Sequence, residues 1–105
     1  MRLSRDLFLG FVKLHILYHA GQEPVYGLWL IEELSHHGYE LSPGTLYPTL
    51  QSLQKEGLLT QGKKVVEGKV RKYYSLTEAG REALASGRKQ AIELLREIND
   101  EPLTH

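Results

Sequence analysis

The hydrophobic pattern of the chain opens with a long apolar block at residues 6–20. At helical spacing this block leaves almost no polar face, and Gly21 follows it as the predicted helix C-cap. A helix that is apolar nearly all round needs cover on more than one side. Because a short chain offers little cover, we expect a second subunit to supply part of it, through Leu7, Phe8 and Phe11.

A second apolar period follows and predicts a helix over about residues 26–37. Leu28, Ile31 and Leu34 recur at helical spacing and are expected to point inward, and Gly38 is the expected stop. The link over residues 38–41 is short, as a helix-turn-helix requires.

A third helix has a clear N-terminal signal, because Ser42 occupies a cap position and Pro43 the first helical position. Its apolar residues lie four and three positions apart and form one stripe: Leu46, Leu50 and Leu53. Pro48 lies inside this helix, where a proline typically costs ~3 kcal/mol, so we expect an irregular or kinked first turn.

The opposite face of the third helix is small and polar, at about 100° of rotation per residue. It carries Gly44, Pro48, Gln51, Ser52 and Lys55, flanked by Thr45 and Tyr47. This composition favours a face that contacts something other than the protein core, although an ordinary solvated face is the alternative.

A hairpin and a last helix complete the pattern. Residues 58–66 and 69–76 are predicted strands, joined by a turn at Glu67 and Gly68. Thr77 and Glu78 then open a helix, as an N-cap and an acid that complements the helix dipole. Two heptads of small and apolar residues follow, enough to extend a dimer interface. They are Leu84, Gly87, Ala91, Leu94 and Ile98, with Leu95 beside them.

The composition fits one soluble domain of 105 residues, 41% apolar and 25% charged. We expect an α+β, mainly α fold: a winged helix-turn-helix core over about 6–76 and a C-terminal dimerisation helix over about 77–99. The absence of cysteine excludes a disulfide scaffold and a thiolate zinc site. Because the chain has no apolar run of 18 residues and no signal-peptide pattern, we expect a cytoplasmic protein without a membrane partner.

The charge distribution changes what the net charge suggests. A formal net charge of zero argues against nucleic acid, because phosphate neutralisation supplies much of DNA affinity. Residues 55–72, however, carry six Lys or Arg against two Glu, a local charge of +4. The six are Lys55, Lys63, Lys64, Lys69, Arg71 and Lys72. The positive charge therefore falls on the predicted hairpin.

Several linked motifs over about residues 7–84 resemble the PadR family of transcriptional regulators. They are Tyr26-Gly27, Gly44-Thr45-Leu46-Tyr47-Pro48 with Leu50 and Leu53, Gly57-Leu58-Leu59, and Gly68-x-x-Arg71-Lys72-Tyr73-Tyr74-Ser75-Leu76-Thr77-Glu78-Ala79-Gly80-Arg81. The resemblance implies a winged-helix fold, a homodimer built through the first and last helices, and repression by occupying promoter DNA. With one C-terminal helix, the chain looks like the short branch of the family.

Two departures from the family pattern concern tryptophan. Family members often place a tryptophan in the first wing strand, where this chain has residues 61–65 without one. Members that bind flat aromatic drugs use a tryptophan on the last helix, whereas the single tryptophan here is Trp29 in the second helix. The sequence therefore does not predict a drug pocket of that type, and a small-molecule effector stays unidentified.

The third helix and the hairpin supply the residues that we expect to contact double-stranded DNA. They are Tyr26, Ser42, Gly44, Thr45, Tyr47, Pro48, Gln51, Ser52, Lys55, Lys63, Lys64, Lys69, Arg71, Lys72 and Tyr73. Glutamine pairs with adenine, and lysine pairs with guanine or phosphate. Strand alternation separates Arg71 from Lys72, so only one of them faces the same way as Tyr73. The alternative is that hairpin charges only keep the protein soluble and protect sheet edges.

The histidines carry a weaker signal. His15 and His19 are four positions apart on the first helix, a spacing that can chelate a metal ion. The sequence indicates no third ligand, so we expect a structural role and no metal site. His36 and His37 fit a helix end, where a cation complements the dipole.

No catalytic motif accompanies these features, because the chain has no phosphate loop, no cysteine and no recognisable triad. We expect a non-enzyme without a cofactor: a sequence-specific, homodimeric repressor that places two third helices in successive major grooves of a palindromic operator. The alternatives are a winged helix used for protein–protein contact and a dimer that senses a ligand or a metal.

Overall fold

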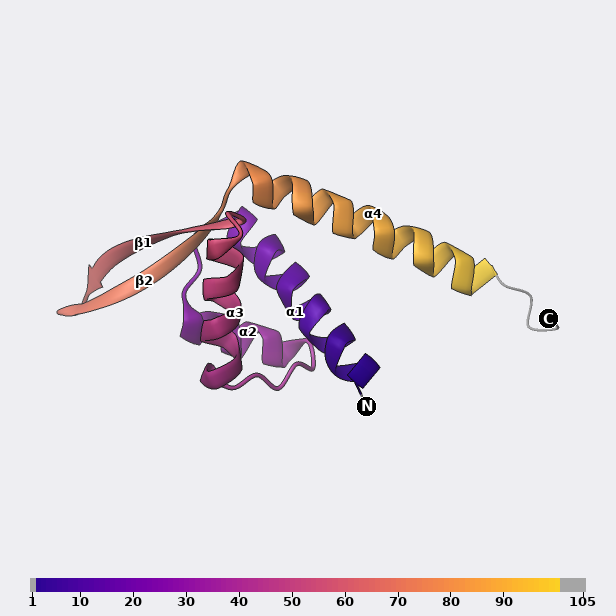
Figure 1. Ribbon diagram of the computed structural model, residues 1–105. Helices are drawn as coiled ribbons and strands as arrows, with labels where there is room; N and C mark the ends of the chain where they lie inside the picture. The colour runs from indigo at the N-terminus through magenta and orange to yellow at the C-terminus, as the bar shows by residue number, and fades with distance from the viewer. Residues whose placement is uncertain (1, 101–105) are drawn as a thin grey trace.

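The computed structural model describes residues 2–100 as four helices and one β-hairpin (Figure 1). In chain order these are α1 (Arg2–Gln22), α2 (Gly27–His36), α3 (Pro43–Lys55), β1 (Leu59–Val66), β2 (Lys69–Leu76) and α4 (Glu78–Asp100). The hairpin projects from one side of the helical body, and α4 extends away from the other side. This arrangement confirms the predicted α+β, mainly α winged-helix fold.

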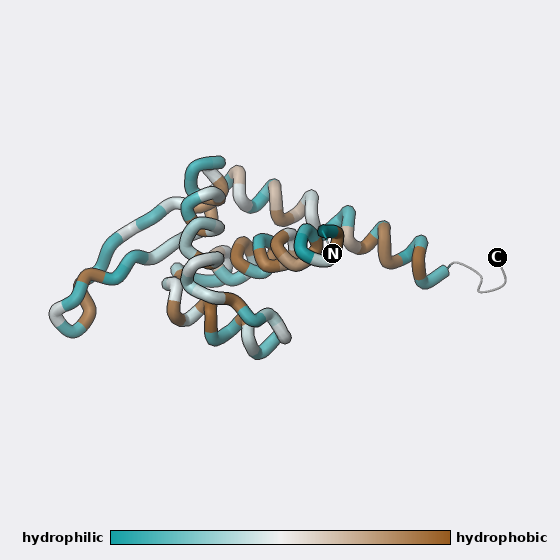
Figure 2. Tube along the Cα trace, turned by 60° about the horizontal axis from the view of Figure 1, so that its bottom comes forward, coloured by the Kyte–Doolittle hydropathy of each residue, from teal (hydrophilic) through white to brown (hydrophobic). Residues whose placement is uncertain are grey.

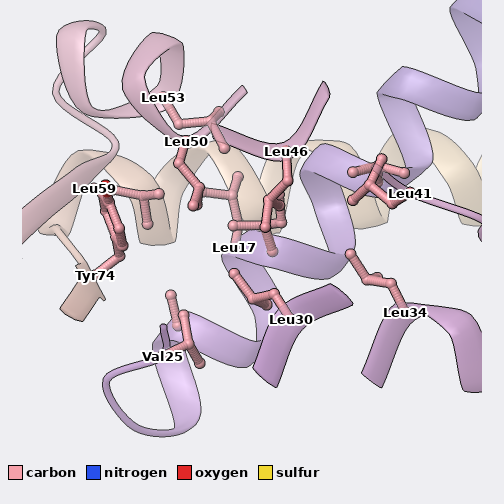
Figure 3. Packing of buried hydrophobic residues seen from close by; sticks show 13 residues of the cluster. Leu17, Val25, Leu30, Leu34, Leu41, Leu46, Leu50, Leu53, Leu59 and Tyr74 are labelled. Atoms are coloured by element: carbon pink, nitrogen blue, oxygen red, sulfur yellow. The ribbon is translucent and has the colours of Figure 1, made fainter. Parts of the chain in front are cut away.

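The core lies where α1, α2 and α3 meet the base of the hairpin (Figure 3). The apolar stripe of α3 is buried as predicted: Leu46 and Leu50 are fully inaccessible and Leu53 nearly so. Each such side chain stabilises the fold by ~1.5–3 kcal/mol relative to exposure. The remaining core residues are Val12, Ile16, Leu17, Ala20, Val25, Leu30, Leu34, Leu41, Leu59 and Tyr74.

The end of α1 corrects a sequence prediction, because the helix continues through Gly21 to Gln22. Gly21 is therefore not the helix cap. A Cβ atom built on Gly21 would lie 2.9 Å from Cδ2 of Leu76, so the glycine allows β2 to pass close to α1. The presence of glycine at position 21 is explained by a close contact between two elements, which the hydrophobic pattern of the sequence does not predict.

The inward face of α2 is also shifted from the prediction. Leu30 and Leu34 are fully buried and four positions apart, but Leu28 is 66% exposed. The helix begins at Gly27, one residue later than expected, so Leu28 lies in its first turn beside the hairpin. The prediction that Leu28 points into the core is wrong.

α3 starts at the predicted residues, but the hydroxyl of Ser42 makes no cap hydrogen bond and donates to the hydroxyl of Thr45 at 3.4 Å instead. Ser42 has extended backbone angles and Pro43 is the first helical residue. The carbonyl of Ser42 accepts bonds from the N–H groups of both Thr45 (3.1 Å) and Leu46 (2.9 Å). α3 then runs through Pro48 as a single helix, and the hydroxyl of Thr49 donates to the carbonyl of Thr45 at 2.7 Å.

The hairpin turn falls at the predicted residues. Glu67 and Gly68 both have positive φ angles, 51° and 77°, which is the backbone of a tight two-residue turn. Glycine adopts this conformation without strain. The turn sets an antiparallel register in which Lys64 lies opposite Arg71 and Lys63 opposite Lys72.

Thr77 links the start of α4 to the loop between α3 and β1. Its hydroxyl oxygen accepts a hydrogen bond from the N–H of Gly80 at 3.0 Å, as the predicted N-cap should. The same hydroxyl donates to the carbonyl of Gly57 at 2.6 Å. Gly80 is buried, and a Cβ atom built on it would meet the backbone carbonyl of Leu58. The cap and the glycine together fix where α4 leaves the hairpin.

Replacing Gly80 by alanine should therefore destabilise the protein, because the collision is with backbone that cannot move freely. We expect Gly80→Ala to lower the free energy of unfolding by about 1–3 kcal/mol in thermal unfolding. Gly10→Ala is the matched control, because nothing lies within 4 Å of a Cβ built there. That control should be neutral or stabilising, by up to ~1 kcal/mol. Equal stability of the two variants would contradict the contact.

Candidate nucleic-acid interface

A two-bond bridge attaches the start of α2 to the hairpin. The N–H of Val25 donates to the carbonyl of Tyr74 at 2.9 Å, and the N–H of Tyr74 donates back at 2.8 Å. The next residue, Tyr26, therefore lies beside Tyr73 on one face of β2. The two rings meet edge to face with their centroids 5.5 Å apart.

Arg71 lies in the same group. Its guanidinium carbon lies 4.0 Å from the centre of the Tyr26 ring, which is a cation–π contact. Its Nη1 atom donates to the hydroxyl of Tyr73 at 3.5 Å, and this hydrogen bond raises the pKa of Arg71 above its ordinary value. The cation is thus held in place by two tyrosines before any partner binds.

The faces of the hairpin separate as the sequence predicts. Tyr74 is 3% exposed and belongs to the core, whereas Tyr73 is half-buried against Tyr26. Arg71 lies on the face of Tyr73, and Lys72 on the face of Tyr74. Arg71 and Lys72 therefore do not face the same way.

The middle of the hairpin is a ladder of like charges. Two successive rungs pair a cation with a cation: Lys63 with Lys72, and Lys64 with Arg71. Like charges directly opposite each other destabilise a strand pair. Within residues 2–100, the ion pairs within 4.0 Å all involve Glu33 and histidines, so none of these four cations is paired with an acid. An anion supplied from outside would remove the repulsion.

A groove between the helices and the hairpin collects many of the predicted residues. Tyr26, Gly27, Leu28, Tyr47 and Gln51 form its helical wall. Its hairpin wall comprises Val66, Glu67, Lys69, Val70, Arg71, Lys72 and Tyr74. The ring of Tyr47 packs on Gly27, where a built Cβ atom would lie 2.7 Å from the ring carbon Cζ. The sequence did not assign six residues of this groove to the site: Gly27, Leu28, Val66, Glu67, Val70 and Tyr74.

The other predicted residues lie outside this groove. Lys63 and Lys64 line a second hollow with Tyr26 and Tyr73 on the opposite edge of the hairpin. Ser42 and Thr45 line a third hollow at the N-terminal end of α3. The remaining four are exposed along α3, on the face that the sequence predicts: Gly44, Pro48, Ser52 and Lys55.

The residues predicted for a dimer lie on two apolar surfaces. On α1, Leu7 and Phe11 are 48% and 44% exposed, whereas Phe8 packs against the core. Leu84 also packs against the core, and Ala91 is half-buried. The distal half of α4 extends beyond the body and presents apolar turns along its length (Figure 2). Those exposed residues are Leu94, Leu95 and Ile98.

Three helices followed by a cationic hairpin define a winged-helix protein. Residues 16–86 match the Transcriptional regulator PadR-like family, and the chain belongs to that family. It is 53% identical over 94 residues to the transcriptional regulator Rv3488 of Mycobacterium tuberculosis, across 90% of this chain and 88% of that protein.

Two solved structures agree with this assignment. A PadR family transcriptional regulator from Eggerthella lenta superposes with a TM-score of 0.81 at 29% identity, covering 94% of this chain and 88% of that one. A PadR-like transcriptional regulator from Bacillus cereus gives 0.78 at 31% identity, covering 95% of both chains. Within residues 2–100, none of the helices is long and apolar enough to cross a membrane.

The two cation–cation pairs of the hairpin lead to a prediction about the stability of the free protein. Lys63→Glu should place an acid opposite Lys72 and stabilise the hairpin by about 0.2–1 kcal/mol at low salt. The gain should shrink as salt screens the pair. Lys89→Glu is the control, because it makes the same charge change on the exposed surface of α4. Thermal unfolding at low and high salt measures both, and equal shifts for the two variants would argue against the ladder.

Proposed function

We propose that this regulator is a homodimeric, sequence-specific DNA-binding repressor. The observation that carries the proposal is the ladder of four cations on two rungs of the hairpin. Such a ladder is unfavourable in the free protein and becomes favourable beside phosphate groups, whose negative charge it neutralises. The chain as a whole carries no net charge, so this local concentration is the electrostatic basis for binding.

The hairpin is assigned the backbone contacts. Arg71 and Lys64 carry charge on one face, and Lys63 and Lys72 carry it on the other. A hairpin lying along the minor groove has phosphates on both sides, so both faces find partners. Arg71 is held by Tyr26 and Tyr73, and therefore loses little side-chain freedom when it binds.

Helix α3 is assigned the base contacts. Gln51 and Tyr47 lie at the groove edge, and the amide of Gln51 matches the paired donor and acceptor of adenine. Ser42 and Thr45 lie at the N-terminus of α3, a position that favours a phosphate. Because α3 contains no arginine, guanine reading is weak, and part of the specificity comes from DNA shape.

The dimer is assigned to α1 and α4. Leu94, Leu95 and Ile98 are each more than half exposed on a helix that extends beyond the body. A second copy that packs its own α1 and α4 against these surfaces would bury both at once. The two copies of α3 would then read half-sites about 34–36 Å apart on a palindromic operator.

The assignment of backbone contacts to the hairpin predicts a change in the salt dependence of DNA affinity. Replacing Arg71 and Lys72 by alanine should weaken binding to every DNA sequence and reduce the salt slope by about 1.8, or ~0.9 per lost phosphate contact. Titration of labelled DNA from upstream of the protein's own gene, at several salt concentrations, measures the slope. The control Lys89→Ala with Arg96→Ala removes the same charge from exposed positions of α4. An unchanged slope in the Arg71 and Lys72 variant would rule out the assignment.

The helix assignment predicts a different signature. Gln51→Ala should lower the preference for the operator over unrelated DNA by about 1–3 kcal/mol, with the salt slope unchanged. Competition titrations with operator and scrambled duplexes measure both quantities. Gln54→Ala provides the comparison, since Gln54 is an exposed residue of α3 that bonds to Gln61 of the hairpin instead. A uniform loss on all DNA would show that Gln51 does not read bases.

The dimer assignment predicts that charge on α4 separates the subunits. Leu94→Glu combined with Ile98→Glu should shift the protein to a monomer in sedimentation equilibrium, because each buried carboxylate would lack a partner. Gln90→Glu, an exposed position of the same helix, should leave the dimer intact. A wild-type monomer, or a double variant that stays dimeric, would contradict this interface.

A further inference from the structure

Three histidines from two helices converge where the end of α2 meets α1. His15 and His19 lie one turn apart on α1, and His37 follows the last residue of α2. One ring nitrogen from each lies within 4.8 Å of the others. The His37 ring centroid is 5.1 Å from that of His15 and 6.3 Å from that of His19. The sequence supplied only the pair on α1, and folding adds a third imidazole.

A single carboxylate accompanies these rings. Oε2 of Glu33 lies 3.1 Å from Nε2 of His37 and 3.8 Å from Nε2 of His19. Glu33 lies on α2 one turn before His37, so the same helix end presents both groups. Three imidazoles and one carboxylate are a ligand set found at zinc sites in proteins.

One polar atom of this cluster is not satisfied by the protein alone. Among residues 2–100, Nε2 of His19 is buried without a hydrogen-bond partner, because its distance to Glu33 is too long for one. A buried polar atom without a partner is uncommon and calls for an explanation. A metal ion that accepts the nitrogen lone pair would provide it.

The protonation state of the rings agrees with this explanation. Burial lowers the pKa of both His15 and His19 below the ordinary histidine value. The neighbouring His37 lowers both values further, whereas Glu33 raises them. Neutral imidazole is the form that binds metal ions.

We propose that His15, His19 and His37 bind one divalent transition-metal ion of the zinc class, with the carboxylate of Glu33 beside two of the three rings. Zinc–nitrogen bonds of about 2.0–2.1 Å place tetrahedral ligand atoms ~3.4 Å apart, so nitrogens that lie within 4.8 Å of one another must close by up to about 1.4 Å. Imidazole nitrogen selects zinc, nickel or copper over magnesium and calcium, which prefer oxygen ligands.

An open hollow gives an ion access to the histidines, and an ion bound there would link two helices. The three histidines line an open hollow between α1 and α4, with Phe11, Leu84 and Arg88 on its rim. A bound ion would fasten the end of α2 to α1, and α3 begins six residues after His37. If the proposed DNA binding holds, the ion therefore links the position of α3 to the helix that carries the proposed dimer contact.

The site is tested by calorimetric titration of the full chain, treated with EDTA, with ZnCl₂. We expect one ion per chain, and at least a 10-fold loss of affinity for His19→Ala and for His37→Ala. His36→Ala is the matched control: His36 is 65% exposed and lies 3.9 Å from Glu33, but it is not part of the cluster. Its affinity should equal that of the wild type, and MgCl₂ should give no heat of binding.

Three results would overturn the site. They are no zinc binding by the wild type, a loss in His36→Ala equal to that in His19→Ala, and zinc binding unaffected by His19→Ala and His37→Ala. Far-UV circular dichroism checks that each variant folds, and His19→Gln replaces His19→Ala if the smaller side chain does not. The titration contains no DNA, so a failure of this site and a failure of the proposed DNA binding are separately visible.

Discussion

The pair of backbone hydrogen bonds between Val25 and Tyr74 is the constraint on which the rest of the interface depends. Val25 and Tyr74 are 2% and 3% exposed, so the bridge is protected from water, where its bonds are difficult to replace. It anchors the base of an otherwise two-stranded hairpin to the helical core. It also fixes which side of β2 is directed to the core, and with it the face on which every charged residue of β2 lies.

The arrangement of charged residues on the hairpin follows from the inward direction of Tyr74 and from the register that the turn sets. With Tyr74 directed inward, Arg71 must face Tyr26, and two rungs of the ladder become cation opposite cation. A neutral chain thereby concentrates repulsion at one place, at the expense of its own stability. Proteins keep such unfavourable arrangements where function uses them, and here a polyanion would relieve the repulsion. The face of α3 beside it is polar and without arginine, which gives the helix a role in fit rather than in attraction.

Local signals predicted most of the fold. The helix start at Ser42 with Pro43, the turn at Glu67 with Gly68 and the cap at Thr77 each depend on residues within one turn and lie where predicted, although Ser42 makes no side-chain cap hydrogen bond. Predictions were wrong where contact with a neighbouring element determines the role of a residue. Gly21 leaves room for the side chain of Leu76 on β2, and Leu28 lies beside the hairpin. The histidine cluster was missed for the same reason, because His37 reaches His15 only after α2 packs on α1. The roles of individual residues on DNA stay predictions, since they depend on a partner outside the chain.

We propose that the locally charged hairpin gives this neutral protein its affinity for DNA. The most direct measurement is the binding of the wild-type protein to DNA from upstream of its own gene, compared with unrelated DNA of equal length, across a salt series. We expect tighter binding to the upstream DNA and, on both DNAs, a linear fall of log affinity with log salt that reflects several phosphate contacts. Binding that is absent, or that does not change with salt, would contradict it.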